Sequence, residues 1–179
     1  LEEVNIRNAN KLKDFKKASR LKQLTFDETR ITDGLKWQLS KLKEFDFALK
    51  RQNIFIVGDC STGKTSLAST IGIKALEKGA KVIYITLDDL LVESKIKKKV
   101  WNNILNADLV IIDDVFYIAP TEEELVLIYK ILMFLQETRS IILVTNRPLS
   151  SWKEMKCDSH LMETLQKRLM QDAQIISLA

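Results

Sequence analysis

Residues 58–65 form the pattern Gly-x-x-x-x-Gly-Lys-Thr, whose residue types and spacing suit the binding of nucleotide phosphates. Glycines let backbone amides close around phosphate oxygens, and a helix that starts at the lysine offers its positive end. Lys64 is expected to reach the β- and γ-phosphates, and the Thr65 hydroxyl to ligate magnesium. We therefore expect ATP and Mg²⁺ as ligands. The residues predicted to bind the nucleotide are Gly58, Asp59, Cys60, Ser61, Thr62, Gly63, Lys64, Thr65 and Ser66.

Two carboxylates, Asp113 and Asp114, follow the apolar run 109–112. An aspartate at the end of such a strand can support the magnesium ion of a bound nucleotide, and this is the role expected of Asp113. Asp114 would then orient or deprotonate the attacking water as a general base. The alternative is a pair of strand-end carboxylates that cap a turn, but a phosphate-binding loop upstream favours the catalytic interpretation.

A polar segment, Thr145-Asn146-Arg147-Pro148, ends the apolar run 141–144. Functional residues of open α/β sheets usually lie in the loops at the strand ends. A polar side chain that leaves the sheet beside the phosphate-loop strand can contact both the γ-phosphate and the attacking water, so Asn146 is a candidate catalytic residue. The alternative is a plain Asn-Arg-Pro turn.

These groups need a parallel sheet to bring them together, and the sequence predicts one. Short apolar runs typical of buried strands occur at 54–57, 82–85, 109–112, 141–144 and 174–178. Helical segments are predicted between them at 64–78, 90–105, 121–138 and 159–171. Thr121 and Glu124 are spaced as a capping box. Alternating strands and helices indicate an α/β fold of three layers, with helices on both faces of the sheet.

Composition is consistent with one globular domain. The chain has 179 residues, 46% of them hydrophobic and 29% charged, and only two cysteines, Cys60 and Cys157. This usage argues against disorder and against a disulfide framework. No apolar stretch is long enough for a membrane span, and the charged start does not look like a signal peptide. A cytoplasmic protein without membrane contact is expected.

A net charge of +4 fits contact with DNA without sequence specificity. Basic residues are crowded between Lys11 and Lys22, and again between Lys95 and Lys99. The second group is either a DNA contact or a solvated charged face. We divide the chain into a basic helical N-terminal segment, 1–50, and an ATPase core, 51–179.

From about Leu21 onward the sequence resembles the IstB-like ATP-binding proteins, the helper ATPases of certain insertion sequences. They belong to the AAA+ superfamily, together with the replicative helicase loaders of the DnaC/DnaI type. The segments that carry the resemblance are 53–65, 72–79, 109–117 and above all Val144-Thr145-Asn146-Arg147-Pro148-Leu149-Ser150-Ser151-Trp152. In the tail, Leu165-Gln166-Lys167-Arg168-Leu169 is similar to the family's Asp-Arg-Leu stretch.

The resemblance implies a five-stranded sheet of order 5-1-4-3-2, with Asn146 as the sensor 1 residue. It also implies that Arg168 is an arginine finger, which reaches the nucleotide of a neighbouring subunit, so a homo-oligomer on DNA is expected. The sequence stops at Ala179, just after the fifth apolar run. A module without a helical lid is therefore expected.

Three residues depart from the family pattern. Asp114 stands where glutamate is usual, and its side chain is one methylene shorter, so we expect slow hydrolysis with ATP serving chiefly as an assembly switch. Lys167 replaces the aspartate before the finger, which leaves Arg168 open to interpretation as an exposed helix charge. Cys60 stands where proline is more common, and bound ATP is expected to shield it from alkylation.

Several functions remain open at this stage. The favoured one is a transposition helper that binds and hydrolyses ATP and works with a transposase on DNA. A replicative helicase loader, with a helicase as its partner, is the alternative within the superfamily. A small P-loop kinase is less favoured, because the acidic pair and the Asn-Arg-Pro segment fit water as the acceptor. A nucleotide-binding adaptor that does not hydrolyse ATP is the remaining class.

Overall fold

A computed structural model describes residues 33–41, 46–47, 50–96 and 98–179. The basic residues between Lys11 and Lys22 lie outside these ranges, as does most of the predicted segment 1–50. Of that segment the structure describes helix α2 (Asp33–Lys41), which contacts the sheet near its last strand.

The five predicted strands form one parallel sheet. They are β1 (Asn53–Gly58), β2 (Val82–Thr86), β3 (Leu109–Asp113), β4 (Ser140–Thr145) and β5 (Ala173–Leu178). Their order across the sheet is β2-β3-β4-β1-β5, and each pair of neighbours is parallel. This order is the predicted 5-1-4-3-2 read from the opposite edge, so the predicted fold class is confirmed.

Helices connect the strands. They are α3 (Lys64–Glu77), α4 (Leu87–Ile96), α5 (Lys98–Leu105), α6 (Glu122–Thr138) and α7 (Ser159–Met170), with a 3-10 helix η3 (Leu149–Glu154) before α7. The expected single helix 90–105 is wrong. Helix α4 begins directly after β2, because the Thr86 hydroxyl accepts the Asp89 N–H at 3.1 Å in the manner of an N-cap. The predicted capping box at Thr121 and Glu124 is present at the start of α6.

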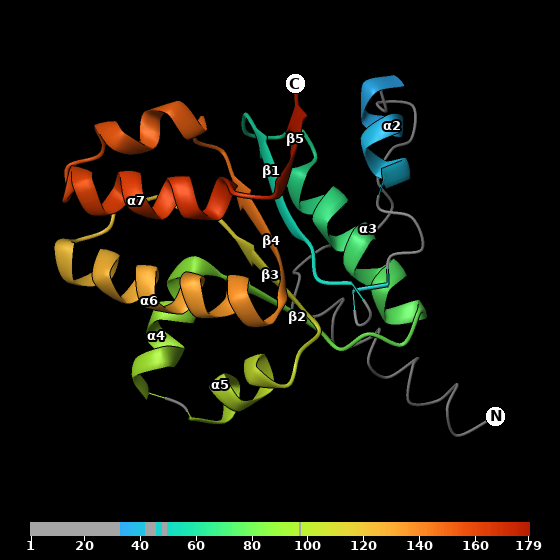
Figure 1. Ribbon diagram of the computed structural model, residues 1–179, viewed down its shortest axis with the longest axis horizontal. Coiled ribbons are helices and arrows are strands. Elements are labelled where there is room, and N and C mark those ends of the chain that lie inside the picture. Colours follow the sequence, from blue (N-terminus) through green and yellow to red (C-terminus); the bar gives the residue numbers. More distant parts are fainter. Residues whose placement is uncertain (1–32, 42–45, 48–49, 97) are drawn as a thin grey trace.

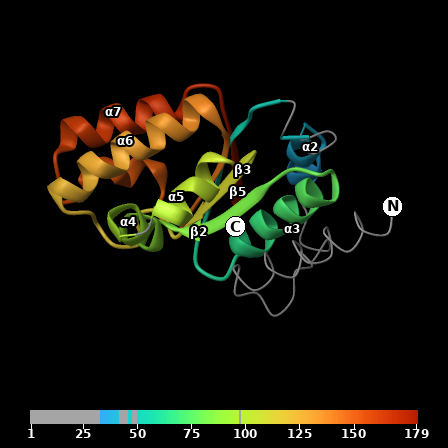
Figure 2. The same ribbon diagram turned by 90° about the horizontal axis from the view of Figure 1, so that it is seen from below.

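The helices cover both faces of the sheet (Figure 1, Figure 2). Helices α2 and α3 lie on one face, and α4, α5, α6 and α7 lie on the other. Successive β1 side chains pack against the two helical layers alternately, because side chains along a strand point to opposite faces of the sheet. Ile54 and Ile56 pack in the cluster with α3, whereas Phe55 packs in the cluster with α6 and α7. No helix in the described part of the chain is long and apolar enough to cross a membrane.

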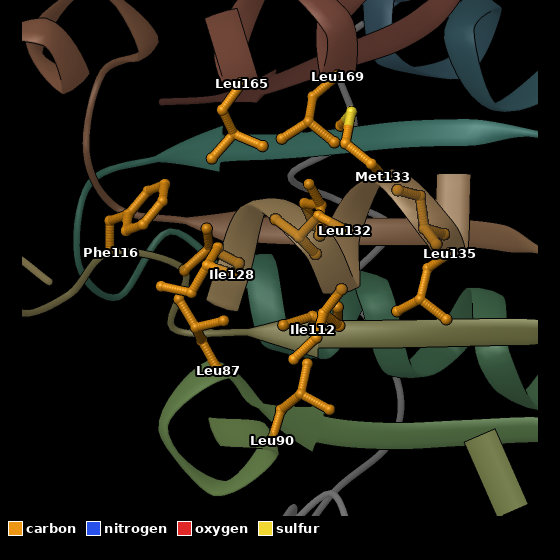
Figure 3. Close-up of a cluster of buried hydrophobic side chains, with 14 of the residues drawn as sticks. Leu87, Leu90, Ile112, Phe116, Ile128, Leu132, Met133, Leu135, Leu165 and Leu169 are labelled. Carbon is orange, nitrogen blue, oxygen red and sulfur yellow. The ribbon is translucent and has the colours of Figure 1, made fainter. Parts of the chain in front are cut away.

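The larger cluster joins α4, α6 and α7 to the sheet. Figure 3 shows Leu165 and Leu169 of α7 on one side of α6, Leu132 on α6 itself, and Ile112 of β3 and Leu90 of α4 on the other side. These five side chains are almost wholly buried. Burial of such a side chain contributes roughly 1.5–3 kcal/mol, so this packing fixes the helices on the sheet.

The parallel arrangement gathers the predicted functional segments at one edge. β1 ends at Gly58, β3 at Asp113 and β4 at Thr145. The register pairs Val57 with Thr145, which places the phosphate loop next to the segment that contains Asn146. The carboxyl edge of the sheet is therefore where the site is assembled, as is general for open α/β sheets.

Candidate functional site

The loop between β1 and α3 has the backbone of a phosphate-binding loop. Ser61 and Gly63 both have positive φ, 65° and 90°, so the chain turns back on itself before the helix. Gly63 is the N-cap of α3 and supplies no side-chain cap. The first α-helical bond is from the Leu67 N–H to the Gly63 carbonyl, at 2.9 Å. The amides of the first turn are thus left for a ligand, and the helix dipole makes an anion the favoured one.

Gly58 is required by the close approach of β5. A Cβ at this position would lie 2.4 Å from the Leu178 carbonyl oxygen and 2.9 Å from the Thr62 hydroxyl oxygen. No side chain fits between these atoms. The first glycine of the motif therefore lets the end of β5 pack against the loop.

Two side chains bond back to the loop itself. The Thr62 hydroxyl donates to the Asp59 carbonyl at 2.8 Å. The Lys64 ammonium group donates to the same carbonyl. The Lys64 side chain consequently lies against its own loop.

Asp113 is the buried centre of the site, with 6% of its surface exposed. The Thr65 hydroxyl lies 2.9 Å from Asp113 Oδ2, and the Tyr84 hydroxyl donates to the same oxygen. Asp113 Oδ1 accepts the backbone N–H of Asp114 at 2.8 Å. Burial, followed by the nearby Asp113 carboxylate, raises the pKa of Tyr84 above its ordinary value. The phenol therefore stays protonated and acts as a donor.

Thr65 and Asp113 present the kind of oxygen atoms that Mg²⁺ takes as ligands. Magnesium is usually bound by one or two protein oxygens together with substrate phosphates, rather than by a cage of side chains. Within the described ranges there is no cluster of three or more His, Cys, Asp and Glu residues. The hydroxyl–carboxylate pair beside the phosphate loop fits the shared mode of binding, and these two residues would hold the ion.

Asp114 lies in a tight turn after β3. Its φ is 54° and that of Phe116 is 56°, and the Tyr117 N–H donates to the Asp114 carbonyl at 3.1 Å. Aspartate enters the left-handed region more readily than most residues. This backbone gives a physical reason for the aspartate at a position where glutamate was expected. As a residue, Asp114 is exposed at the carboxyl edge.

Asn146 lies beside the phosphate loop, with its Nδ2 3.6 Å from the Cys60 sulfur. The residue before it, Thr145, is buried and donates its hydroxyl to the Val115 carbonyl at 2.8 Å. The residue after it, Arg147, donates its Nε–H to the Phe116 carbonyl at 2.6 Å. The segment after β4 therefore bonds to the turn after β3 and sets the two loops relative to each other.

Arg168 is not part of this group. It lies on α7 and shares a cavity of 570 Å³ with Arg51 and Asn53, at the amino end of β1. The phosphate loop is at the other end of this six-residue strand, which spans roughly 20 Å. The Arg168 guanidinium lies over the Tyr129 ring, 5.9 Å from the ring centroid. Arg168 therefore cannot contact a nucleotide bound to its own chain.

Lys167, the residue before it, pairs with Glu163 at 2.8 Å on the exposed face of α7. The Lys167 ammonium group accounts for the lowered pKa of Glu163. Lys167 and Arg168 are both exposed in the last turn of α7, and Lys167 is paired along its own helix.

Sequence reasoning missed Tyr84 and Arg147. Tyr84 was taken only as part of an apolar strand, yet it is opposite Ile111 in the register, two residues before Asp113. A hydroxyl in such a strand, diagonal to a strand-end carboxylate, was the available signal. Trp152 is also central, because its buried ring packs on Phe55 and edge-on against Phe116, with centroids 5.9 and 4.7 Å apart.

Comparison with known proteins gives related sequences that include ATP-binding proteins of insertion sequences. An IS21-like insertion-sequence ATP-binding protein of Bacteroides fragilis is 31% identical over 147 residues, which cover 79% of this chain and 56% of the relative. The IS232 ATP-binding protein of Bacillus thuringiensis is 29% identical over 150 residues, 80% of this chain and 60% of the relative. The chain thus spans somewhat more than half the length of these relatives.

Solved structures with the same fold include replication proteins. The DnaC helicase loader is 20% identical with a TM-score of 0.70, over 93% of this chain and 99% of that one. DnaI is 14% identical with a TM-score of 0.71, over 92% and 90%. AMPPCP-bound DnaA from Aquifex aeolicus is 23% identical with a TM-score of 0.64, over 83% and 47%. At these identities the likeness shows the fold alone.

The family comparison covers nearly the whole chain. A model of the family described as IstB-like ATP binding protein matches residues 2–179. That range includes the phosphate loop, the strand-end acidic pair and the Asn146 segment, which the fold gathers at one edge. The chain therefore belongs to the family of IstB-like ATP-binding proteins.

Proposed function

We propose that this protein binds ATP with magnesium at the carboxyl edge of its sheet and hydrolyses it, as a helper of a transposase on DNA. One observation carries the proposal. The Thr65 hydroxyl and the Asp113 carboxylate are 2.9 Å apart, with Asn146 next to Cys60 of the same loop. A phosphate loop, a metal-binding pair and a polar strand-end side chain together form a site for phosphoryl transfer.

The loop supplies the binding step. Backbone amides at the start of α3 and the Lys64 ammonium would hold the β- and γ-phosphates. Magnesium, when bound, neutralises the charge of these phosphates. Asp113 and Thr65 would keep the ion at the loop, since both are anchored in the core through β3 and α3.

Water is the proposed acceptor. Asp114 accepts a proton from the water while the water oxygen attacks the γ-phosphorus and the bond to the bridging oxygen of ADP breaks. Asn146, which follows the neighbouring strand β4, would contact both the γ-phosphate and the attacking water. The Asp114 carboxylate reaches less far than glutamate would, so we propose a slow reaction in which ATP acts chiefly as an assembly switch.

Arg168 is proposed to act on a neighbouring subunit. Because Arg168 lies at the amino edge of the sheet, it cannot reach the nucleotide site of its own chain. An exposed guanidinium at this edge can face the carboxyl edge of a second copy. Such a head-to-tail contact generates rings or filaments. We propose a homo-oligomer on DNA in which each nucleotide lies between two copies, with DNA bound without sequence preference.

The helper role is preferred over that of a helicase loader. The relatives that are 31% and 29% identical over 79% and 80% of this chain are insertion-sequence proteins, whereas the likeness to DnaC and DnaI is one of fold. Within the core, charge is the feature that favours DNA contact. Of the lysines between Lys95 and Lys99, Lys95 is exposed on α4, Lys97 lies outside the described residues, and the other side chains are not described.

Phosphate release with and without duplex DNA tests the proposed activity. We expect release from the wild type, several-fold stimulation by DNA of any sequence, and loss of both in Lys64→Ala. Lys130→Ala, which removes an exposed lysine from α6, is the matched control and should behave as wild type. Nucleotide binding without phosphate release under both conditions would instead identify a non-hydrolysing adaptor and refute the proposal.

A further inference from the structure

Tyr84 contacts the site but has no part in the chemistry proposed above. It lies on β2, one of the two edge strands, and packs against the cluster on the α3 face of the sheet. Its hydroxyl donates to Asp113 Oδ2 across the neighbouring strand. Partial burial of the tyrosine hydroxyl costs free energy, because the hydroxyl loses contact with water. The hydrogen bond to the Asp113 carboxylate offsets this cost.

The hydrogen bonds to Asp113 come from three directions. Oδ2 accepts from Thr65 and from Tyr84, and Oδ1 accepts from the Asp114 amide. The Asp114 bond is local, because it joins adjacent residues. The bonds from Thr65 and Tyr84 come from α3 and from β2, so they fix the carboxylate plane relative to the rest of the fold.

Thr65 and Tyr84 have different duties in this arrangement. The Thr65 hydroxyl is adjacent to the phosphate loop and offers its oxygen to the metal. The phenol of Tyr84 belongs to an edge strand and has no backbone link to the loop. Its hydroxyl contacts Asp113 and also Thr65. Its contribution to the site is to hold the Asp113 carboxylate in place while the loop accommodates a nucleotide. Groups that orient a metal ligand in this way typically change metal affinity by 10–100-fold.

We propose that Tyr84 is a positioning residue that holds the Asp113 carboxylate in the orientation required for magnesium, and so sets how strongly magnesium enhances nucleotide binding. This inference rests on the proposed magnesium–ATP site. It concerns a residue of β2, outside the phosphate loop and outside the acidic pair.

Tyr84→Phe removes the hydroxyl and keeps the ring. The measurement is the Kd of a fluorescent, non-hydrolysable ATP analogue in excess EDTA and in saturating magnesium. We expect the ratio of the two Kd values to fall about tenfold in Tyr84→Phe, through weaker binding in magnesium only. Tyr117→Phe, which removes a hydroxyl from an exposed tyrosine, should leave both Kd values unchanged. Circular dichroism checks that each variant is folded.

A double variant separates positioning from packing. In an Asp113→Asn background, Tyr84→Phe should bring no further loss of the magnesium enhancement, because the group that it orients is already altered. Equal weakening in EDTA and magnesium, or no weakening, would overturn the inference while leaving the proposed function intact. A wild type whose Kd does not respond to magnesium would overturn both.

Discussion

Gly58→Ala tests whether the phosphate loop depends on the end of β5. The new Cβ would lie 2.4 Å from the Leu178 carbonyl oxygen, where an ordinary C···O contact is about 3.3 Å or more. Backbone at the loop or at β5 must therefore move by roughly 1 Å, and such overpacking costs about 1–3 kcal/mol. A loop displaced by that distance no longer presents its amides correctly, and misplacement of about 1 Å can cost 100-fold in rate.

Gly79→Ala is the matched control. Gly79 has φ of 90°, and a Cβ there would meet nothing within 4 Å. Backbone strain alone should then cost about 1–2 kcal/mol of the free energy of unfolding, with no effect on the site. Urea denaturation measures the stability of both variants, and phosphate release measures turnover. We expect similar losses of stability but a large loss of turnover only in Gly58→Ala. Wild-type turnover in Gly58→Ala would refute the reasoning.

Three further changes have defined outcomes. Asp114→Glu should raise steady-state phosphate release, because the longer carboxylate reaches the water, and an unchanged or lower rate would show that Asp114 does not limit turnover. Alkylation of Cys60, followed by mass spectrometry, should be slower with ATP than without, and equal labelling would place its thiol away from the nucleotide. Trp152→Ala should lower the free energy of unfolding by about 3–5 kcal/mol in denaturant titration, because the buried ring packs on Phe55 and Phe116, and a loss under 1 kcal/mol would contradict that packing.

The sequence predicted those features that depend on interactions between residues close together in the chain. The glycine pattern of 58–65 specified the loop, since its backbone conformation and its helix start are encoded within eight residues. The capping box at Thr121 was likewise predictable, because both hydrogen bonds join residues three apart. The sheet order was predicted from the family resemblance. The residue pattern within single strands does not indicate which strands are neighbours.

Features that depend on distant segments were not predicted. The contact of Tyr84 with Asp113 requires the register of β2 against β3, which is set by packing of the whole sheet. The start of α4 at Leu87 was missed because Thr86 belongs to a strand and also caps the helix. The place of Arg168 at the amino edge follows from the direction of α7, which returns the chain to the start of β5.

Mixing two inactive variants tests the central claim, that ATP is hydrolysed at a site completed by a neighbouring subunit. Lys64→Ala lacks the loop cation but keeps Arg168, and Arg168→Ala has the reverse defect with nucleotide affinity intact. Each alone should release no phosphate in the presence of duplex DNA. An equal mixture should recover about one quarter of the wild-type rate, because about one contact in four pairs an intact loop with an intact arginine. A mixture as inactive as its components would contradict the account.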